Sequence, residues 1–155
     1  IAPSTHIVFN CQMGRGRTTT GMVCAILLCI NRDAAAKAQY LADVLASHPL
    51  PTRPVKPPAP PAVFRGEYQA VLRLLRVLEH GREAKEELDL VLDHASHMQN
   101  LRDAIQDVAL RAAAPSATPA ARASSLERAR AYLERYIYLI VFSAYLVQLL
   151  ERGCQ

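Results

Sequence analysis

The clearest sign of chemistry in this chain is a cysteine followed by an arginine after five intervening residues. These two residues are Cys11 and Arg17. The residues between them include Gly14 and Gly16, and Thr18 follows the arginine. Glycine permits a positive φ, so successive amide groups of such a turn can point inward at one anion. The spacing therefore predicts a tight anion-binding turn between a cysteine and an arginine.

The stretches on either side of this turn indicate how it is positioned. The apolar run at residues 7–9 is typical of a buried strand, and residues 18–31 carry apolar side chains at helical spacing. A strand would deliver Cys11 to the turn, and the helix start would add unpaired amides and a favourable dipole. Arg17 could then hold two oxygens of an anion, and the same positive field is expected to lower the pKa of the Cys11 thiol.

A thiolate beneath a phosphate-sized anion site predicts nucleophilic attack on phosphorus, giving a cysteinyl-phosphate that water later hydrolyses. Cys11 and Arg17 are the candidate catalytic residues, the arginine stabilising the equatorial oxygens in the transition state. The alternative is an ordinary turn with a buried cysteine, but this interpretation gives the two arginines of the turn no role. The chain contains no Walker A pattern, which excludes a P-loop NTPase. The candidate phosphate-binding residues are Gln12, Met13, Gly14, Arg15, Gly16 and Thr18.

The composition narrows the class of protein. The chain has 155 residues, is 51% hydrophobic and carries a net charge of +4, which fits a globular chain of about one domain. Residues 82–107 are acidic on balance, whereas residues 1–81 and 108–155 are basic. No dense Lys/Arg run with interleaved aromatics occurs, so no nucleic-acid partner is expected, while the basic N-terminal half could favour an anionic ligand.

The cysteines and the longest apolar stretch exclude further classes. The four cysteines form no CxxC pair and no zinc-like spacing with histidine, so we expect no metal site, and no cofactor is expected either. Cys24 and Cys29 lie among apolar residues and are expected to be free thiols in a reducing compartment. Residues 136–150 form an uncharged apolar stretch of 15 residues, whereas a spanning helix needs about 20. We therefore expect a buried core helix there and no transmembrane segment.

Most of the chain beyond the turn has helical periodicity. Residues 49–61 hold seven of the ten prolines and predict an extended connector, and residues 112–125 predict a flexible loop. Helices are predicted at residues 18–31, 34–46, 67–80, 83–97, from 100 onward, and from a capping box at 124 to 153. The predicted organisation is residues 1–48 with the turn, a Pro-rich connector at 49–63, and residues 64–153 as the helical remainder of the same domain.

The predicted fold class is α/β, with one strand before the turn followed by about six helices. A strand–turn–helix unit normally belongs to a parallel sheet, and a single strand cannot make a sheet. Sister strands are therefore expected outside this chain. The chain begins at Ile1 without an initiator methionine, which supports its interpretation as the C-terminal portion of a larger domain.

Three segments resemble the cysteine-dependent phosphatases of the protein-tyrosine-phosphatase superfamily, and among them the bacterial inositol-polyphosphate phosphatases. They are the signature at residues 10–21, the segment 98–102 and the segment 134–140. The resemblance implies a cytosolic phosphomonoesterase with Cys11 as nucleophile and Arg17 as phosphate clamp. It also implies that Gln99 could position the hydrolytic water, although an ordinary polar residue at a helix start is the plainer interpretation.

The same resemblance bears on substrate and on activity. Related lipid phosphatases carry a basic residue where Arg15 stands, which favours a phosphoinositide or inositol phosphate over phosphotyrosine; a solvent-facing arginine without selectivity is the alternative. Most of these enzymes have a histidine where this chain has Asn10, and their general acid is an aspartate upstream of the cysteine, whereas residues 1–10 contain no Asp or Glu. The resemblance thus leaves two functions open, a phosphatase and a catalytically weak pseudophosphatase acting as a signalling scaffold, with redox sensing by Cys11 as a side property. The expected partners are a phosphorylated small molecule or lipid headgroup, a phosphoprotein, or signalling proteins.

Overall fold

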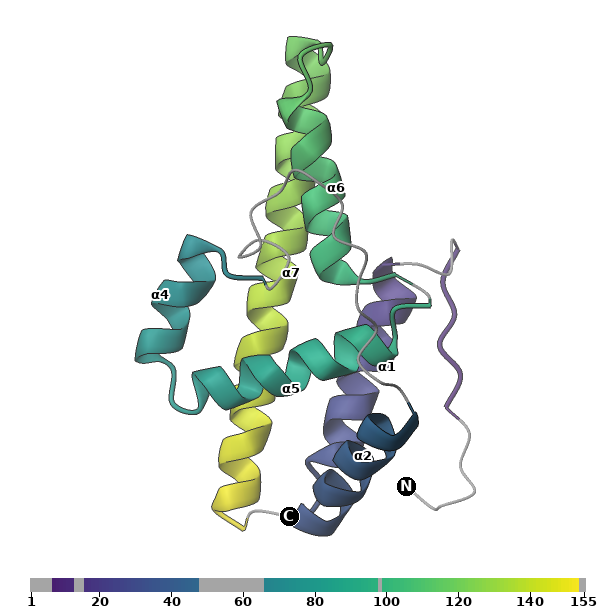
Figure 1. The fold of residues 1–155 in the computed structure, drawn as a ribbon, viewed down its shortest axis with the longest axis vertical. Helices are drawn as coiled ribbons and strands as arrows, with labels where there is room; N and C mark the ends of the chain where they lie inside the picture. The colour runs from purple at the N-terminus through teal and green to yellow at the C-terminus, as the bar shows by residue number, and fades with distance from the viewer. Residues whose placement is uncertain (1–6, 13–15, 48–65, 98, 154–155) are drawn as a thin grey trace.

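Helices build the described part of the chain, which comprises residues 7–12, 16–47, 66–97 and 99–153 of a computed structural model. The long C-terminal helix α7 runs the length of the molecule, with α6 along its upper half and α5 crossing it lower down (Figure 1). Helices α1 and α2 pack together beside α5. The helices are α1 (Gly16–Ile30), α2 (Ala34–Ser47), α4 (Gln69–Val77), α5 (Gly81–His94), α6 (Leu101–Ala113) and α7 (Pro119–Glu151).

The predicted α/β fold class is wrong for the described residues, because none of them forms a strand. Residues 7–11 form no regular element, and Val8 is 86% exposed rather than buried. The physical reason is that a strand needs a second strand for its backbone hydrogen bonds, and the described part of the chain offers none. Phe9 instead packs on α1, where a side chain at Gly21 would come within 2.7 Å of its ring.

The helix predictions are close for most elements and wrong at the loop 112–125. The structure leaves only residues 114–118 between α6 and α7, and α7 begins at Pro119 rather than at the predicted capping box. Thr118 is the N-cap, its Oγ1 accepting a hydrogen bond from the Ala121 amide at 3.2 Å. Proline in the first turn is pre-set for a helix and the alanines that follow are strong helix formers, so the helix starts early. The Pro-rich connector lies outside the described residues.

The second half of α7 is the centre of the core. Tyr136, Ile140 and Ala144 are fully buried, whereas Tyr138 is 71% exposed on the outer face. By length and composition alone α7 is the one described helix that could cross a membrane, a test that core helices of soluble proteins also pass. Only 39% of its most apolar window is buried, and Tyr138, Val141 and Tyr145 are exposed on the other face, so the expected core helix is buried along one face only.

A buried polar network joins α5, α6 and α7. The Tyr136 hydroxyl donates to Asp89 Oδ1 at 2.7 Å, and Arg102 lies 3.2 Å from Asp89 Oδ2 while also pairing with Asp93. Burial raises the pKa of Tyr136, and the two carboxylates raise the pKa of Arg102 despite the opposing effect of its burial. Asn100, the N-cap of α6, donates to Asp93 at 2.7 Å and so fixes the junction between α5 and α6.

We expect Arg102→Met to lower the free energy of unfolding by about 1.5–3 kcal/mol, because it removes a buried cation from the half-buried carboxylates of Asp89 and Asp93, and among the described residues only Asp89 keeps another cation, Lys85 at 2.7 Å. Denaturant unfolding followed by circular dichroism measures the loss. The matched control is Arg130→Met, which removes an arginine that is 70% exposed and pairs with Glu134 on the surface of α7. Such exposed pairs contribute little, so equal destabilisation by the two variants would contradict a structural role for the network.

Candidate active site

The thiol of Cys11 lies against the first turn of α1. Thr18 Oγ1 donates a hydrogen bond to Cys11 Sγ at 2.9 Å, and Thr18 itself is only 6% exposed. Helix α1 begins at Gly16, two residues before the predicted start, so Arg17 projects from its first turn with an exposed side chain. The backbone thus brings together a thiol, a hydroxyl donor and the unpaired amides of a helix N-terminus, as the anion-binding turn requires.

A cleft of about 420 Å³ opens beside this thiol, and we call it the arginine cleft. The start of the chain and α1 contribute Cys11, Gly16 and Arg17, and Gln99 lines it from just before α6. Among the described residues, helices α6 and α7 supply the rest of the lining, Arg111, Arg128, Tyr132 and Arg135. The volume lies within the range of about 300–1,000 Å³ usual for small-molecule sites.

The predicted site residues fall into three groups. Cys11, Gly16, Arg17 and Gln99 share the arginine cleft, and Thr18 supports the sulfur from within α1. Gln12 is exposed and is not part of the cleft wall. Met13, Gly14 and Arg15 lie outside the described residues, so their phosphate-binding role stays a prediction.

Four arginines give the cleft its electrostatic character. Arg17 comes from α1, Arg111 from α6, and Arg128 and Arg135 from α7. Within the described stretches none of the four pairs with a carboxylate, and Arg135 lies instead over the Tyr132 ring, 5.6 Å from its centre. A Cβ at Gly16 would lie 3.1 Å from Arg135 Nη1, so the Arg135 guanidinium is in contact with the first residue of α1.

The arginines of α6 and α7 are absent from the candidates derived from sequence. Arg128, Tyr132 and Arg135 follow each other at intervals of four and three residues, which places them on one face of a helix. That spacing is the signal that could have found them. All three lie inside the helix predicted from 124 to 153, but nothing local indicates that this face meets the cysteine some 120 residues earlier.

Carboxylates are missing from this cleft. All 14 acidic residues of the chain belong to the described stretches, and none of them lines the cleft. The general acid that the family resemblance implies is therefore not supplied to the cleft by a carboxylate of this chain. Anion binding is the property that the observed groups support directly.

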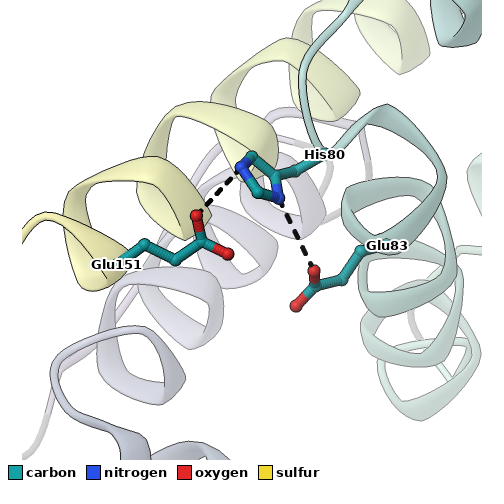
Figure 2. Close-up of side chains that lie close together, drawn as sticks. All are labelled: His80, Glu83 and Glu151. Carbon is teal, nitrogen blue, oxygen red and sulfur yellow. Dashed lines mark ion pairs between the residues drawn. The ribbon is translucent and has the colours of Figure 1, made fainter.

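One group of side chains in the described residues could hold a metal by proximity alone, and Figure 2 shows it. His80 Nε2 lies 3.0 Å from Glu151 and its Nδ1 lies 3.9 Å from Glu83. The two carboxylates therefore face different nitrogens of one ring, and the other oxygen of Glu83 pairs with Lys37 at 2.9 Å. We interpret the group as ion pairs that hold the turn before α5 against the end of α7.

Comparison with known proteins identifies relatives along most of the chain. A family model described as PTP-like phytase, inositol hexakisphosphate, matches residues 1–29. The protein named paladin from Mus musculus is 36% identical over 150 residues, 93% of this chain. Paladin from Xenopus tropicalis is 34% identical over 92% of the chain, and paladin from Homo sapiens is 34% identical over 93%. The phosphatase resemblance drawn from the signature is thereby confirmed.

The chain spans only about 16% of the length of these curated relatives. No solved structure matches it significantly. The matched family model ends at residue 29, so it includes Cys11 and Arg17 and stops before the helices that carry the other arginines.

We expect Thr18→Val to move the pH midpoint of Cys11 alkylation upward by about 1–2 units, because a hydrogen bond to a charged acceptor is worth about 1.5–3 kcal/mol. The rate of reaction with iodoacetamide, followed against pH by mass spectrometry of the peptide that contains Cys11, measures the midpoint. Thr20→Val is the control, since Thr20 Oγ1 donates to the Gly16 carbonyl at 2.8 Å. A midpoint that shifts equally in both variants would show that the bond from Thr18 to the sulfur has no special role.

Proposed function

The chain is a homologue of the paladins along nearly its whole length, and on that premise we propose that it carries the phosphate-binding and nucleophilic residues of a cysteine-dependent phosphomonoesterase. The observation that carries the proposal is the placement of the Cys11 thiol and the Arg17 guanidinium in one cleft, with Thr18 donating to the sulfur. A thiolate and a cation at the N-terminus of a helix are suited to binding and attacking a phosphate dianion.

In this proposal the reaction has two displacements at phosphorus. The Cys11 thiolate forms an S–P bond as the ester P–O bond breaks, and the departing alcohol oxygen takes a proton from water. Arg17 and the α1 amides hold the equatorial oxygens during this step. Water then attacks the cysteinyl-phosphate, phosphate is released, and the sulfur leaves as a thiolate that Thr18 stabilises with its hydrogen bond.

The preferred substrate in this proposal is an inositol phosphate or phosphoinositide rather than phosphotyrosine. The arginine cleft supports it, because its cations exceed what a single phosphate group requires. The matched family model names inositol hexakisphosphate, a ring bearing several phosphates. The cytosol is the proposed compartment, since a thiolate nucleophile must remain reduced.

A second candidate function is a pseudophosphatase that binds phosphorylated ligands with little turnover and acts in signalling. The specific observation in its favour is the absence of every one of the chain's carboxylates from the cleft. Leaving-group protonation contributes about 10²–10⁴-fold to such reactions. Binding would then persist where hydrolysis of unactivated esters is weak.

We expect Cys11→Ser to lower phosphate release by about a thousandfold or more, because serine lacks a comparable nucleophile, and to leave inorganic phosphate binding in place. Phosphate release from a panel of phosphoinositides and phosphotyrosine peptides measures the first effect, and isothermal titration with inorganic phosphate measures the second. Cys29→Ser is the control, because Cys29 is exposed near the other end of α1. Full turnover in Cys11→Ser would exclude the mechanism, whereas phosphate binding without turnover in the unaltered chain would favour the pseudophosphatase.

The missing carboxylate predicts a steep dependence on the leaving group. We expect aryl phosphates with acidic phenols to be hydrolysed about 10²–10⁴-fold faster than alkyl phosphates, because only the alkyl leaving groups need a proton. Initial rates for a series of esters, plotted against the pKa of the released alcohol, give the slope. A flat series would mean that another group of this chain protonates the leaving oxygen.

A further inference from the structure

We propose that Arg128 of α7 and Arg111 of α6 form a second anion subsite that binds a second phosphate of the substrate, with Arg135 between this subsite and the reacting phosphate. The inference rests on the proposed function and extends it, since it assigns substrate specificity to helices that follow the catalytic signature by about 100 residues. The ligand chemistry is a small molecule or headgroup that carries at least two phosphate groups.

The placement of Arg135 divides the arginine cleft into an inner and an outer part. Its Nη1 lies 3.1 Å from where a Gly16 side chain would begin, next to the start of α1 and on the reacting side. Arg128 lies seven residues earlier on the same helix, about 10 Å along its axis. Both line one continuous cleft with Cys11, so an extended anion can reach from the thiol to Arg128.

The outer part of the cleft carries positive charges that no carboxylate of the described stretches neutralises. Arg111 and Arg128 are both exposed and line the cleft, and neither pairs with a carboxylate in the described stretches. Within the described residues, the Arg111 side chain donates a hydrogen bond from Nε to the Asp107 carbonyl at 3.2 Å. Cations that converge on one cleft repel each other, and a phosphate bound between them replaces that repulsion with charge-assisted hydrogen bonds.

Arg135 is held for this task by its neighbours. The Arg135 guanidinium lies over the Tyr132 ring, 5.6 Å from its centre, and both residues line the cleft, so the ring restrains the group by a cation–π contact. Tyr136, the next residue, is fully buried and bonded to Asp89, so α7 cannot rotate to carry Arg135 away. A planar donor group in a fixed orientation suits bidentate contact with a phosphate.

Binding measured in a Cys11→Ser background tests the subsite without relying on turnover. The probes are inositol monophosphate and inositol bisphosphate in solution, titrated calorimetrically against chains that also carry Arg128→Gln, Arg111→Gln or Arg135→Gln. We expect Arg128→Gln and Arg111→Gln each to weaken bisphosphate binding about tenfold or more, and monophosphate binding by much less. Arg135→Gln should weaken both ligands, because it lies between the two positions.

Arg130→Gln is the matched control, with the same change on the same helix but at an arginine paired with Glu134 outside the cleft. A preference for bisphosphate that survives Arg128→Gln and Arg111→Gln, or falls equally in Arg130→Gln, would overturn the subsite. Thermal unfolding of each variant verifies that it folds. If the unaltered chain, which keeps Cys11, shows no turnover while the preference for bisphosphate persists, only the proposed phosphatase function is contradicted and the subsite stands.

A second arm distinguishes the source of the phosphates. Phosphatidylcholine vesicles containing a phosphatidylinositol monophosphate or bisphosphate replace the soluble ligands in a sedimentation assay. Equal losses of preference in solution and on vesicles support a subsite for the phosphate groups themselves. A loss confined to vesicles would assign these arginines to the membrane surface and overturn the subsite.

Discussion

The burial of Tyr136 fixes the rotation of α7, and the rest of the arrangement depends on it. Its hydroxyl donates to Asp89, which Arg102 in turn holds, so α5, α6 and α7 meet at one polar centre. Gly66 also packs against the Tyr136 hydroxyl. Its φ is +67°, and no side chain would fit there because a Cβ would come within 2.6 Å of that hydroxyl. Successive residues on a helix differ by about 100°, so fixing Tyr136 also fixes the direction of Arg135.

The two halves of the candidate site are positioned by different kinds of contact. Cys11 is held locally, by the bond from Thr18 and by the packing of Phe9 on Gly21, within about a dozen residues of chain. The arginines of α6 and α7 are held by tertiary packing, through the network around Arg102 and the cap at Asn100. Cys11 could thus be proposed as the nucleophile from a short motif, whereas the side chains around it depend on contacts between distant segments.

This difference explains how much the sequence could predict. The helices at 34–46 and 83–97 were found within a few residues, because apolar periodicity and capping signals are local. The strand at residues 7–9 was wrong, because an apolar run shows only a tendency that a partner strand must complete. The position of Arg128 and Arg135 in the cleft could not be predicted, because periodicity shows that they share a helix face but not which segment that face contacts.

The distribution of charge explains why the same cleft is compatible with both candidate functions, a phosphatase and a pseudophosphatase that binds phosphorylated ligands. Cations around a thiol favour a bound dianion and a thiolate at once, so the same field serves recognition and the nucleophile. Proton delivery is a separate requirement that needs an acid, and every carboxylate of this chain lies away from the cleft, several of them committed to ion pairs such as Arg102–Asp93 and Lys37–Glu87. Under the proposed function, phosphate recognition through α6 and α7 does not depend on the acid that completes the reaction, because the cations line the cleft and the carboxylates of this chain do not.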